Sequence, residues 1–176
     1  MKAQSNIKRT MQILRELAAA GVTECCVCAG ARNAPFIEVL EKTAQFKVWH
    51  GFEERSMAFF ALGRAKRLQK PVAIITTSGT ALAETLPAVI EAQASQIPLL
   101  VVSADRPRSF RLSGSPQTMP QLDVLKTFVE KVYDLESEDT LNLADWGRGD
   151  RPVAPTLPIH INVCFAEPLL DEEVTA

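Results

Sequence analysis

Apolar residues fall into two kinds of segment along this chain, and the two kinds alternate. The first segment repeats apolar residues at helical spacing from Ile7 to Ala18, and Gly21 follows it as a stop signal. Residues 22–28 then form a short apolar run of the length expected for a buried strand. The pattern therefore predicts a first helix followed by a first strand.

The same change from strand pattern to helix pattern recurs further along the chain. The predicted strands are residues 22–28, 46–49, 72–76 and 99–103, and the helices predicted after the first three are residues 36–44, 53–68 and 81–94. Parallel strands need crossover connections, and these place helices over the sheet. The alternation predicts an α/β, doubly wound fold, with a mainly parallel sheet and helices on both faces.

The pattern is weaker beyond Pro120. Residues 122–130 favour a helix, and residues 131–135 and 159–163 favour strands. The glycines and prolines of residues 141–158 oppose regular structure, so we expect an extended loop there instead of another crossover helix. The sequence shows no internal repeat, low-complexity tract or linker, which indicates a single domain over residues 1–176.

Composition and charge exclude several classes of partner. The formal net charge is −2 with interspersed signs, so no basic stripe is available to neutralise a nucleic-acid backbone. Every apolar run is far shorter than the roughly 20 residues that cross a bilayer. Arg15 and Glu16 interrupt the segment that would have to be apolar in a signal peptide. We therefore expect a folded, cytoplasmic protein with no membrane span and no nucleic-acid partner.

The cysteines and histidines raise the question of a metal or redox site. Cys25 and Cys28 have C-x-x-C spacing, but residues three apart on a strand point to opposite faces and cannot grip one metal ion. A second C-x-x-C is missing, so we expect small buried apolar side chains instead. His50 and His160 are too isolated for a metal site, and we assign this chain no metal ligands.

Four segments that follow predicted strands are candidates for the functional site. They are residues 29–35, 50–55, 76–80 and 104–117. In open α/β sheets, ligands bind outside the carboxyl ends of the strands, where loops and helix starts converge. We therefore expect these four segments, which are far apart in sequence, to meet at one edge of the sheet.

Glu53 and Glu54 stand at the start of a predicted helix whose next residues, 57–62, are mostly apolar. A glutamate that faces a dry crevice there would be suited to share a proton with a ring nitrogen, while its neighbour stays ionised at the helix N-terminus. The alternative is that both glutamates only stabilise the helix dipole, because acidic residues are common in first turns.

Residues 76–80 read Thr-Thr-Ser-Gly-Thr and join a predicted strand to a predicted helix. The amides and hydroxyls of such a turn could hold an anion or the polar edge of a heterocycle. The turn lacks the spacing of a P-loop or of a dinucleotide fingerprint, and Ser78 lacks the G-x-S-x-G surround of a hydrolase nucleophile. A plain turn followed by a helix N-cap is the alternative.

Arginines in the candidate segments are suited to clamp carboxylates, because the guanidinium fork matches the two carboxylate oxygens. Their positions favour Arg32 and Arg106 for this role. Arg108 and Arg111 lie further along a polar loop, and we expect them to be solvated charges.

Taken together, these segments carry a resemblance to one known family. Three of the motifs are Gly51-Phe52-Glu53-Glu54-Arg55, Thr77-Ser78-Gly79-Thr80 and Ala104-Asp105-Arg106-Pro107. Residues 28–35, Cys-Ala-Gly-Ala-Arg-Asn-Ala-Pro, and residues 160–169, His-Ile-Asn-Val-Cys-Phe-Ala-Glu-Pro-Leu, complete the set in the same order. The chain resembles the family of 2-succinyl-5-enolpyruvyl-6-hydroxy-3-cyclohexene-1-carboxylate synthase, or cyclohexene-carboxylate synthase for short, over nearly its whole length.

The resemblance implies a transferase of menaquinone biosynthesis that joins isochorismate and 2-oxoglutarate with loss of carbon dioxide. Such an enzyme uses thiamine diphosphate and a divalent metal ion, Mg²⁺ or Mn²⁺. Glu54 matches the family glutamate that hydrogen-bonds the aminopyrimidine ring and so promotes deprotonation of the thiazolium to the ylid. The cofactor supplies the carbanion chemistry, and the protein supplies the proton and the orientation.

The resemblance also assigns the other site residues. Arg32 and Arg106 fall at positions associated with the anionic substrates, and Gln117 falls close to both cofactor and substrate. Thr77, Ser78, Gly79 and Thr80 match the part of the cofactor site on the pyrimidine side. Two departures each remove a polar contact, because Ala31 replaces a family serine and Pro116 replaces a family asparagine. The segment 141–158 departs from the family's usual helix.

The resemblance covers only the pyrimidine-binding domain of the family. The family's central domain and its diphosphate-binding domain, which carries the Gly-Asp-Gly metal motif, do not occur in this sequence. We expect either one domain of a longer protein or a subunit that another chain completes, inactive alone and working as a homo-oligomer in which a second subunit supplies the diphosphate-binding domain. The alternatives are the same domain of another thiamine-diphosphate enzyme, of the acetolactate-synthase type, and a non-catalytic α/β binding module.

Overall fold

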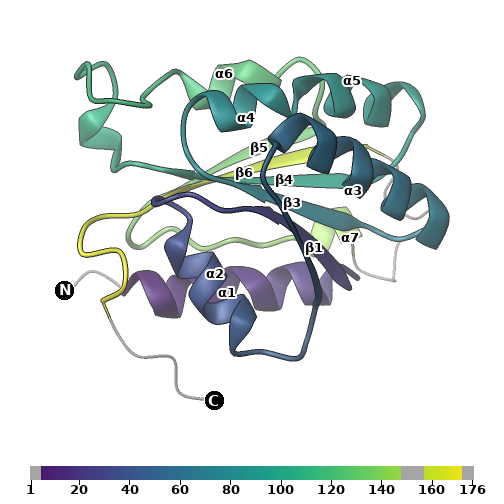
Figure 1. Ribbon diagram of the computed structural model, residues 1–176, viewed down its shortest axis with the longest axis horizontal. Coiled ribbons are helices and arrows are strands. Elements are labelled where there is room, and N and C mark those ends of the chain that lie inside the picture. The colour runs from purple at the N-terminus through teal and green to yellow at the C-terminus, as the bar shows by residue number, and fades with distance from the viewer. Residues whose placement is uncertain (1–4, 148–156, 172–176) are drawn as a thin grey trace.

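The computed structural model describes residues 5–147 and 157–171 and shows one parallel sheet between two layers of helices (Figure 1). The strands are β1 (Glu24–Cys28), β2 (Lys47–Gly51), β3 (Val72–Thr76), β4 (Leu99–Asp105), β5 (Lys131–Leu135) and β6 (Ile159–Cys164). They lie in the order β2-β1-β3-β4-β6-β5, and every pairing is parallel. This arrangement confirms the predicted doubly wound α/β fold.

Helices cover both faces of the sheet, as parallel pairing requires. They are α1 (Asn6–Ala19), α2 (Ala34–Glu41), α3 (Glu54–Leu68), α4 (Thr80–Glu84), α5 (Leu86–Ala94), α6 (Gln121–Leu125) and α7 (Ala144–Gly147). In Figure 1, α1, α2 and α7 lie on one side of the sheet, and α3, α4, α5 and α6 lie on the other. A separate apolar core fills each interface, and Cys25 belongs to one core while Cys26 belongs to the other.

Strand order reverses between β1 and β3, because the chain moves from β1 outward to β2 and then returns to the other side of β1. The register aligns Cys28 with Gly51 and Thr76 with Ser103, so the strands end at the same edge of the sheet. A reversal of this kind leaves a crevice outside the carboxyl ends of the two strands, where ligands bind in such sheets. The fold therefore places the β1 and β3 loops at the expected ligand position.

Helix ends match the local sequence signals. The Ser5 side chain caps α1 by accepting a hydrogen bond from the Lys8 amide at 3.2 Å. Gly21, the predicted stop, follows α1 with a φ of 91°, in the region that favours glycine. Both ends of α1 therefore lie within a few residues of the predicted ones.

Three predicted elements differ from the structure. The helix predicted over residues 81–94 is two helices, α4 and α5, which meet at Thr85 because Pro87 cannot donate a backbone hydrogen bond in the first turn of α5. The helix predicted over residues 122–130 is the short α6. The first part of the segment 141–158 is no plain loop, since Trp146 lies in α7 and is buried in the core; residues 148–156 lie outside the described residues.

All four cysteines are free and buried, which confirms the expectation of apolar packing. Burial raises the pKa of the Cys26 thiol to about 12, and burial followed by the neighbouring Asp105 charge raises the pKa of the Cys164 thiol to about 12. Thiolate is the reactive form, so these thiols are chemically quiet at neutral pH. Among the helices of the described residues, none has the length and apolar character needed to cross a bilayer.

His160 is a polar residue near the start of β6, and we expect it to make the stability of the fold depend on pH. Its ring is fully buried, Nε2 lies 2.8 Å from the Ser103 hydroxyl, and Nδ1 has no hydrogen-bond partner among the described residues. Burial lowers the pKa of His160 to about 4. The folded state therefore keeps the ring neutral at pH values below about 6.5, where the histidine of the unfolded chain takes up a proton.

We predict that the free energy of unfolding falls as pH drops from about 6.5 towards 4, by up to about 1.4 kcal/mol per pH unit, because the unfolded state binds one more proton in this window. Urea unfolding followed by tryptophan fluorescence at pH 7.5, 6 and 5 measures this slope. His160→Gln should flatten it, whereas His50→Gln should retain it, because the His50 side chain is 55% exposed. Equal slopes in wild type and His160→Gln would contradict the assignment.

Candidate functional site

The loops after β1 and β3 are in close contact at the point where strand order reverses. A Cβ atom added to Gly30 would lie only 2.5 Å from Cβ of Thr77, so no larger residue fits without moving one of the loops. The Asn33 side chain fixes the β1 loop by accepting from the Gly30 amide at 2.9 Å and donating to the Cys28 carbonyl at 2.9 Å. The two predicted segments 29–35 and 76–80 are therefore brought together.

The loop after β4 closes over the same turn. Gly79 has a φ of 77°, and a Cβ atom there would lie 2.9 Å from the Gln117 carbonyl oxygen. Gln117 itself has a φ of 55°, an uncommon conformation for a residue with a side chain. Its exposed side chain makes no hydrogen bond within the described part of the chain. Three of the four predicted segments therefore form one contiguous surface.

Glu53 and Glu54, at the start of α3, have different environments. The Glu53 carboxylate is the N-cap and accepts hydrogen bonds from the amides of Arg55 at 3.0 Å and Ser56 at 2.8 Å, and also from the Ser56 hydroxyl. Hydrogen bonds from the Ser56 hydroxyl and amide lower the pKa of Glu53. Glu53 is therefore committed to stabilising the helix.

Glu54 is the glutamate left available for chemistry. Its side chain is half-buried in the first turn of α3, and no residue in the described part of the chain hydrogen-bonds its carboxylate. It lies close to the end of β1, because β2 ends at Gly51, which is paired with Cys28, only three residues before Glu54. Burial and then the charges of Glu54 and Glu53 raise the pKa of the Cys28 thiol to about 12. The fourth predicted segment thus reaches the same edge of the sheet and presents an unpaired carboxylate there.

The turn 76–80 is largely occupied by bonds within the protein. The Gly79 amide donates to Gln121 Oε1 at 2.6 Å, and the Ser78 hydroxyl accepts from Arg106 Nη1 at 3.1 Å. Gly79 is the N-cap of α4, but no side chain caps this five-residue helix. The Gly79 amide is therefore not available to an anion, whereas the Ser78 hydroxyl keeps its own proton to donate. The exposed Thr80 marks the side of the turn that faces solvent.

Arg106 and Arg32, the two predicted carboxylate clamps, differ in how far they are already engaged. Besides Ser78, the Arg106 guanidinium donates only to the Gln117 carbonyl, at 3.4 Å, and no carboxylate within the described residues pairs with it. Arg32 donates to the Phe165 carbonyl at 3.2 Å and forms an ion pair with Glu167 at 3.0 Å. Arg106 therefore has donors to spare, whereas Arg32 would have to exchange one partner for another.

The expectation that Arg108 and Arg111 are solvated charges was wrong as to their partners, because both guanidinium groups are paired with carboxylates although Arg108 is exposed. Arg111 binds both oxygens of Asp134, at 2.6 and 3.0 Å, and Arg108 donates to Asp134 at 2.9 Å and to Asp139 at 2.7 Å. Burial alone would raise the pKa of Asp134, but hydrogen bonds from Arg111, Asn162 and Arg108 lower it to about 2. The two arginines thus fasten the β4 loop to β5, which residue type and position in sequence could not reveal.

Gln121 and Asn162 also contact the site, and the prediction from sequence missed both. Their side chains are buried, Gln121 at the start of α6 and Asn162 in the middle of β6. A signal was available, because a buried strand that reads Ile-His-Ile-Asn-Val carries two polar side chains that need partners. The sequence gives no indication of which partners those are.

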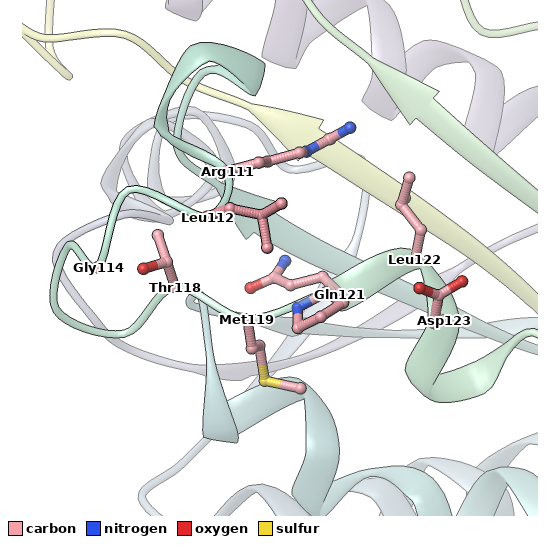
Figure 2. Close-up of a pocket in the computed structure, with 9 residues that line it drawn as sticks. Arg111, Leu112, Gly114, Thr118, Met119, Gln121, Leu122 and Asp123 are labelled. Atoms are coloured by element: carbon pink, nitrogen blue, oxygen red, sulfur yellow. The ribbon is translucent and has the colours of Figure 1, made fainter.

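A pocket of about 590 Å³ lies beside these residues, between the β4 loop and α6 (Figure 2). Leu112 and Met119 from the loop and Leu122 from α6 give it apolar walls, and Gln121 also lines it. Its arginine, Arg111, is engaged with Asp134. Over residues 5–147 and 157–171, no three His, Cys, Asp or Glu side chains gather in a way that could hold a metal ion.

Comparison with known families gives a match over most of the chain. Residues 8–126 match the family model described as thiamine pyrophosphate enzyme, N-terminal TPP binding domain, where thiamine pyrophosphate, or TPP, is another name for thiamine diphosphate. The match includes all four loops of the site. It ends before β5 and β6.

Similar curated proteins share one name, 2-succinyl-5-enolpyruvyl-6-hydroxy-3-cyclohexene-1-carboxylate synthase. The protein from Bdellovibrio bacteriovorus is 43% identical over 97% of this chain and 31% of its own length. The proteins from Akkermansia muciniphila and Chloroflexus aurantiacus are 42% and 40% identical over 89% and 91% of this chain, and 28% of their own lengths. The chain thus spans about a third of the length of these relatives.

A solved structure shows the same fold. Benzoylformate decarboxylase from Polynucleobacter necessarius superposes with a TM-score of 0.74 at 19% sequence identity, over 98% of this chain and 31% of that one. At this level of identity, the likeness concerns the fold alone.

We predict that Gly30→Ala separates the β1 and β3 loops, because the added methyl group overlaps Thr77. Overpacking of this kind costs about 1–3 kcal/mol, which urea unfolding can measure. Gly63→Ala is the matched control, since a Cβ atom there meets nothing within 4 Å and an exposed helix position gains stability from alanine. A Gly30→Ala variant as stable as Gly63→Ala would show that the two loops are not held in contact.

Proposed function

Because the chain belongs to the thiamine pyrophosphate enzyme family, as an N-terminal TPP binding domain, we propose that it is the pyrimidine-binding domain of a cyclohexene-carboxylate synthase. The proposed reaction of the complete enzyme decarboxylates 2-oxoglutarate and adds the resulting succinyl group to isochorismate, a step of menaquinone biosynthesis. The shared name of the similar curated proteins supports this choice over an acetolactate-synthase type of enzyme.

The observation that carries the proposal is the unpaired carboxylate of Glu54 beside the crevice between β1 and β3. A half-buried carboxylate without a hydrogen-bond partner is costly unless a ligand supplies one. Glu53, one residue away, satisfies the helix amides, so Glu54 is not needed for capping. The chemistry of this residue fits the nitrogen-rich edge of an aminopyrimidine ring.

Thiamine diphosphate would supply the carbanion-stabilising centre that decarboxylation of a 2-oxo acid requires. Glu54 would hold a proton at a ring nitrogen of the pyrimidine and exchange it during turnover. Thr77, Ser78, Gly79 and Thr80 would form the wall against which the ring lies. Gly79 suits such a wall because its own amide is bound by Gln121, which keeps the turn rigid.

Arg106 and Arg32 are the proposed binding groups for the carboxylates of the substrates. Arg106 has unused donors beside the turn and needs no rearrangement to accept a carboxylate. Arg32 would exchange Glu167, whose side chain is 73% exposed, for the substrate. Gln117, with its unengaged side chain above Gly79, would contact both cofactor and substrate.

The diphosphate and its Mg²⁺ or Mn²⁺ ion would be held outside this domain. We propose that the diphosphate-binding domain of a second subunit faces this edge of the sheet, so that the complete enzyme is a cytoplasmic homo-oligomer. The domain described here then supplies proton transfer and part of the substrate recognition, and residues 1–176 form one domain of that enzyme.

We predict that Glu54→Gln in the full-length protein lowers the exchange rate of the thiazolium C2 proton by about 10²- to 10⁴-fold, the range for loss of a positioned acid–base group. Proton exchange followed by NMR and quenched-flow measures the rate. Glu53→Gln is the matched control, because its amide oxygen still accepts from one of the two helix amides that the carboxylate binds. Its exchange rate should stay within a few-fold of wild type.

The same pair of variants identifies a wrong assignment. Near-normal exchange in Glu54→Gln with slow exchange in Glu53→Gln would transfer the role to Glu53. Circular dichroism of both variants should match wild type. Urea unfolding should match wild type for Glu54→Gln, since Glu54 makes no hydrogen bond within the described residues, and should show some loss of stability for Glu53→Gln, which gives up one of the two N-cap oxygens.

We further predict that the chain of 176 residues has no synthase activity by itself, since an active centre needs all its parts oriented together. The assay supplies isochorismate, 2-oxoglutarate, thiamine diphosphate and Mg²⁺ to this chain and to the full-length protein. Activity of the full-length protein alone is expected. Turnover by the isolated chain would refute this prediction, and a full-length protein that consumes pyruvate instead of 2-oxoglutarate would favour the acetolactate-synthase type.

A further inference from the structure

Two buried amide side chains, Gln121 and Asn162, link the candidate cofactor turn to Arg106. Gln121 is 2% exposed and Asn162 is fully buried, so their amide groups find their hydrogen-bond partners inside the protein. Burying an amide costs free energy unless each of its polar atoms is hydrogen-bonded. The hydrogen-bond partners of these two amides therefore indicate their role in the structure.

Gln121 is held in one orientation by the groups at its two ends. Its Oε1 accepts from the Gly79 amide at 2.6 Å, and its Nε2 donates to Asn162 Oδ1 at 2.7 Å and to the Ala104 carbonyl at 3.3 Å. Turning the amide over would set its N–H groups against the Gly79 N–H. The side chain therefore connects the turn after β3 to the interior of β6.

Asn162 uses all of its hydrogen-bonding capacity. Its Oδ1 accepts from Gln121 and from the Ser103 hydroxyl, at 2.7 and 2.9 Å. Its Nδ2 donates to Asp105 Oδ2 at 3.2 Å and to Asp134 Oδ1 at 2.9 Å. An asparagine can make at most four such bonds, so its orientation is also fixed.

Asp105 and Arg106 complete a closed circuit. Asp105 Oδ1 accepts from the Arg106 amide at 2.8 Å, and Arg106 Nη1 donates to the Ser78 hydroxyl at 3.1 Å. Ser78 is bonded covalently to Gly79, where the circuit began. The ring runs through Gly79, Gln121, Asn162, Asp105, Arg106 and Ser78.

We propose that Gln121 and Asn162 are positioning residues that set the place of the Arg106 guanidinium relative to the Ser78–Gly79 turn. This inference rests on the proposed function, in which the turn faces the cofactor and Arg106 binds a substrate carboxylate. Satisfied buried networks hold one arrangement rigidly, because each broken bond leaves an unpaired polar group in a low-dielectric interior. The ring therefore couples the position of the Ser78–Gly79 turn to the position of the Arg106 guanidinium.

The test is a double-mutant cycle in the full-length protein with thiamine diphosphate and Mg²⁺. Gln121→Met, which keeps the length of the side chain and removes both hydrogen-bonding ends, should raise the KM for 2-oxoglutarate or isochorismate about 10-fold, since contacting residues of one network couple strongly. In the Arg106→Ala background, the same change should alter that KM less than about 2-fold. Equal effects in the two backgrounds would overturn the proposal.

Ser103→Ala is the matched control for lost stability. Its hydroxyl is as buried as Asn162 and bonds to His160, to Asn162 at 2.9 Å and, weakly, to Gln121 at 3.4 Å, but no bond of the ring itself passes through it. It should lower the free energy of unfolding without raising either KM. A rise in KM equal to that of Gln121→Met would mean that the network acts only through stability.

Hydrogen exchange at the Gly79 amide gives a readout that does not depend on activity. Gln121→Met should speed this exchange, and Gln121→Glu should leave it protected, because a carboxylate still accepts from Gly79 while facing Asn162 Oδ1 without a donor. Gln121→Glu should nevertheless raise KM as Gln121→Met does. Normal KM values in Gln121→Glu would show that Gln121 does not position Arg106 and would overturn the proposal.

The wild-type protein separates this inference from the proposed function. If full-length wild type does not convert isochorismate and 2-oxoglutarate, the proposed function fails. Asn162→Leu then tests the ring alone, because Asn162 is linked to Gly79 only through Gln121. If the ring holds as a unit, this variant should speed exchange at the Gly79 amide about 10-fold. Unchanged exchange there would overturn the ring as well.

Discussion

Parallel pairing of the strands is the constraint on which the remaining structure depends. It sends every carboxyl end to one edge of the sheet and every return path through a helix on one face or the other. Because strand order reverses between β1 and β3, the loops after these strands come into contact there, and Gly30 allows it by having no side chain to collide with Thr77. The candidate site is thus a direct result of topology, assembled from loops that are far apart in sequence.

Two adjacent glutamates have different roles at the edge of the sheet where the strands end, and this difference leaves one carboxylate available there. An α-helix leaves its first amides without partners, and some group has to satisfy them. Glu53 does so, and Glu54 is thereby released from a structural duty. The same logic applies to the arginines, because Arg108 and Arg111 bind the loop in place while Arg106 keeps donors free. Residues of one type beside each other in sequence therefore serve different purposes.

The periodicity of apolar residues was sufficient to predict the parallel sheet and the cluster of loops, because both follow from the order of strands and helices. It did not predict the break at Thr85, which Pro87 causes, and it could not predict the burial of Trp146, which depends on packing against neighbouring elements. Charged and polar residues were harder still. Arg111 appears solvated in sequence and is paired with Asp134, and Asn162 binds partners from three other elements. Such contacts arise only once the chain is folded.

The closed ring of hydrogen bonds has a consequence for how binding energies combine. If a ligand bound at the Ser78–Gly79 turn favours one arrangement of the ring, it also favours the matching position of Arg106. Linkage then requires a ligand bound at Arg106 to change the affinity of the turn by the same factor. Affinity for the cofactor and affinity for an anionic substrate are then not independent traits. Moving the Arg106 guanidinium to suit another substrate would therefore disturb the whole ring, whereas Arg32, which lies outside the ring and pairs with the solvent-exposed Glu167, could change independently.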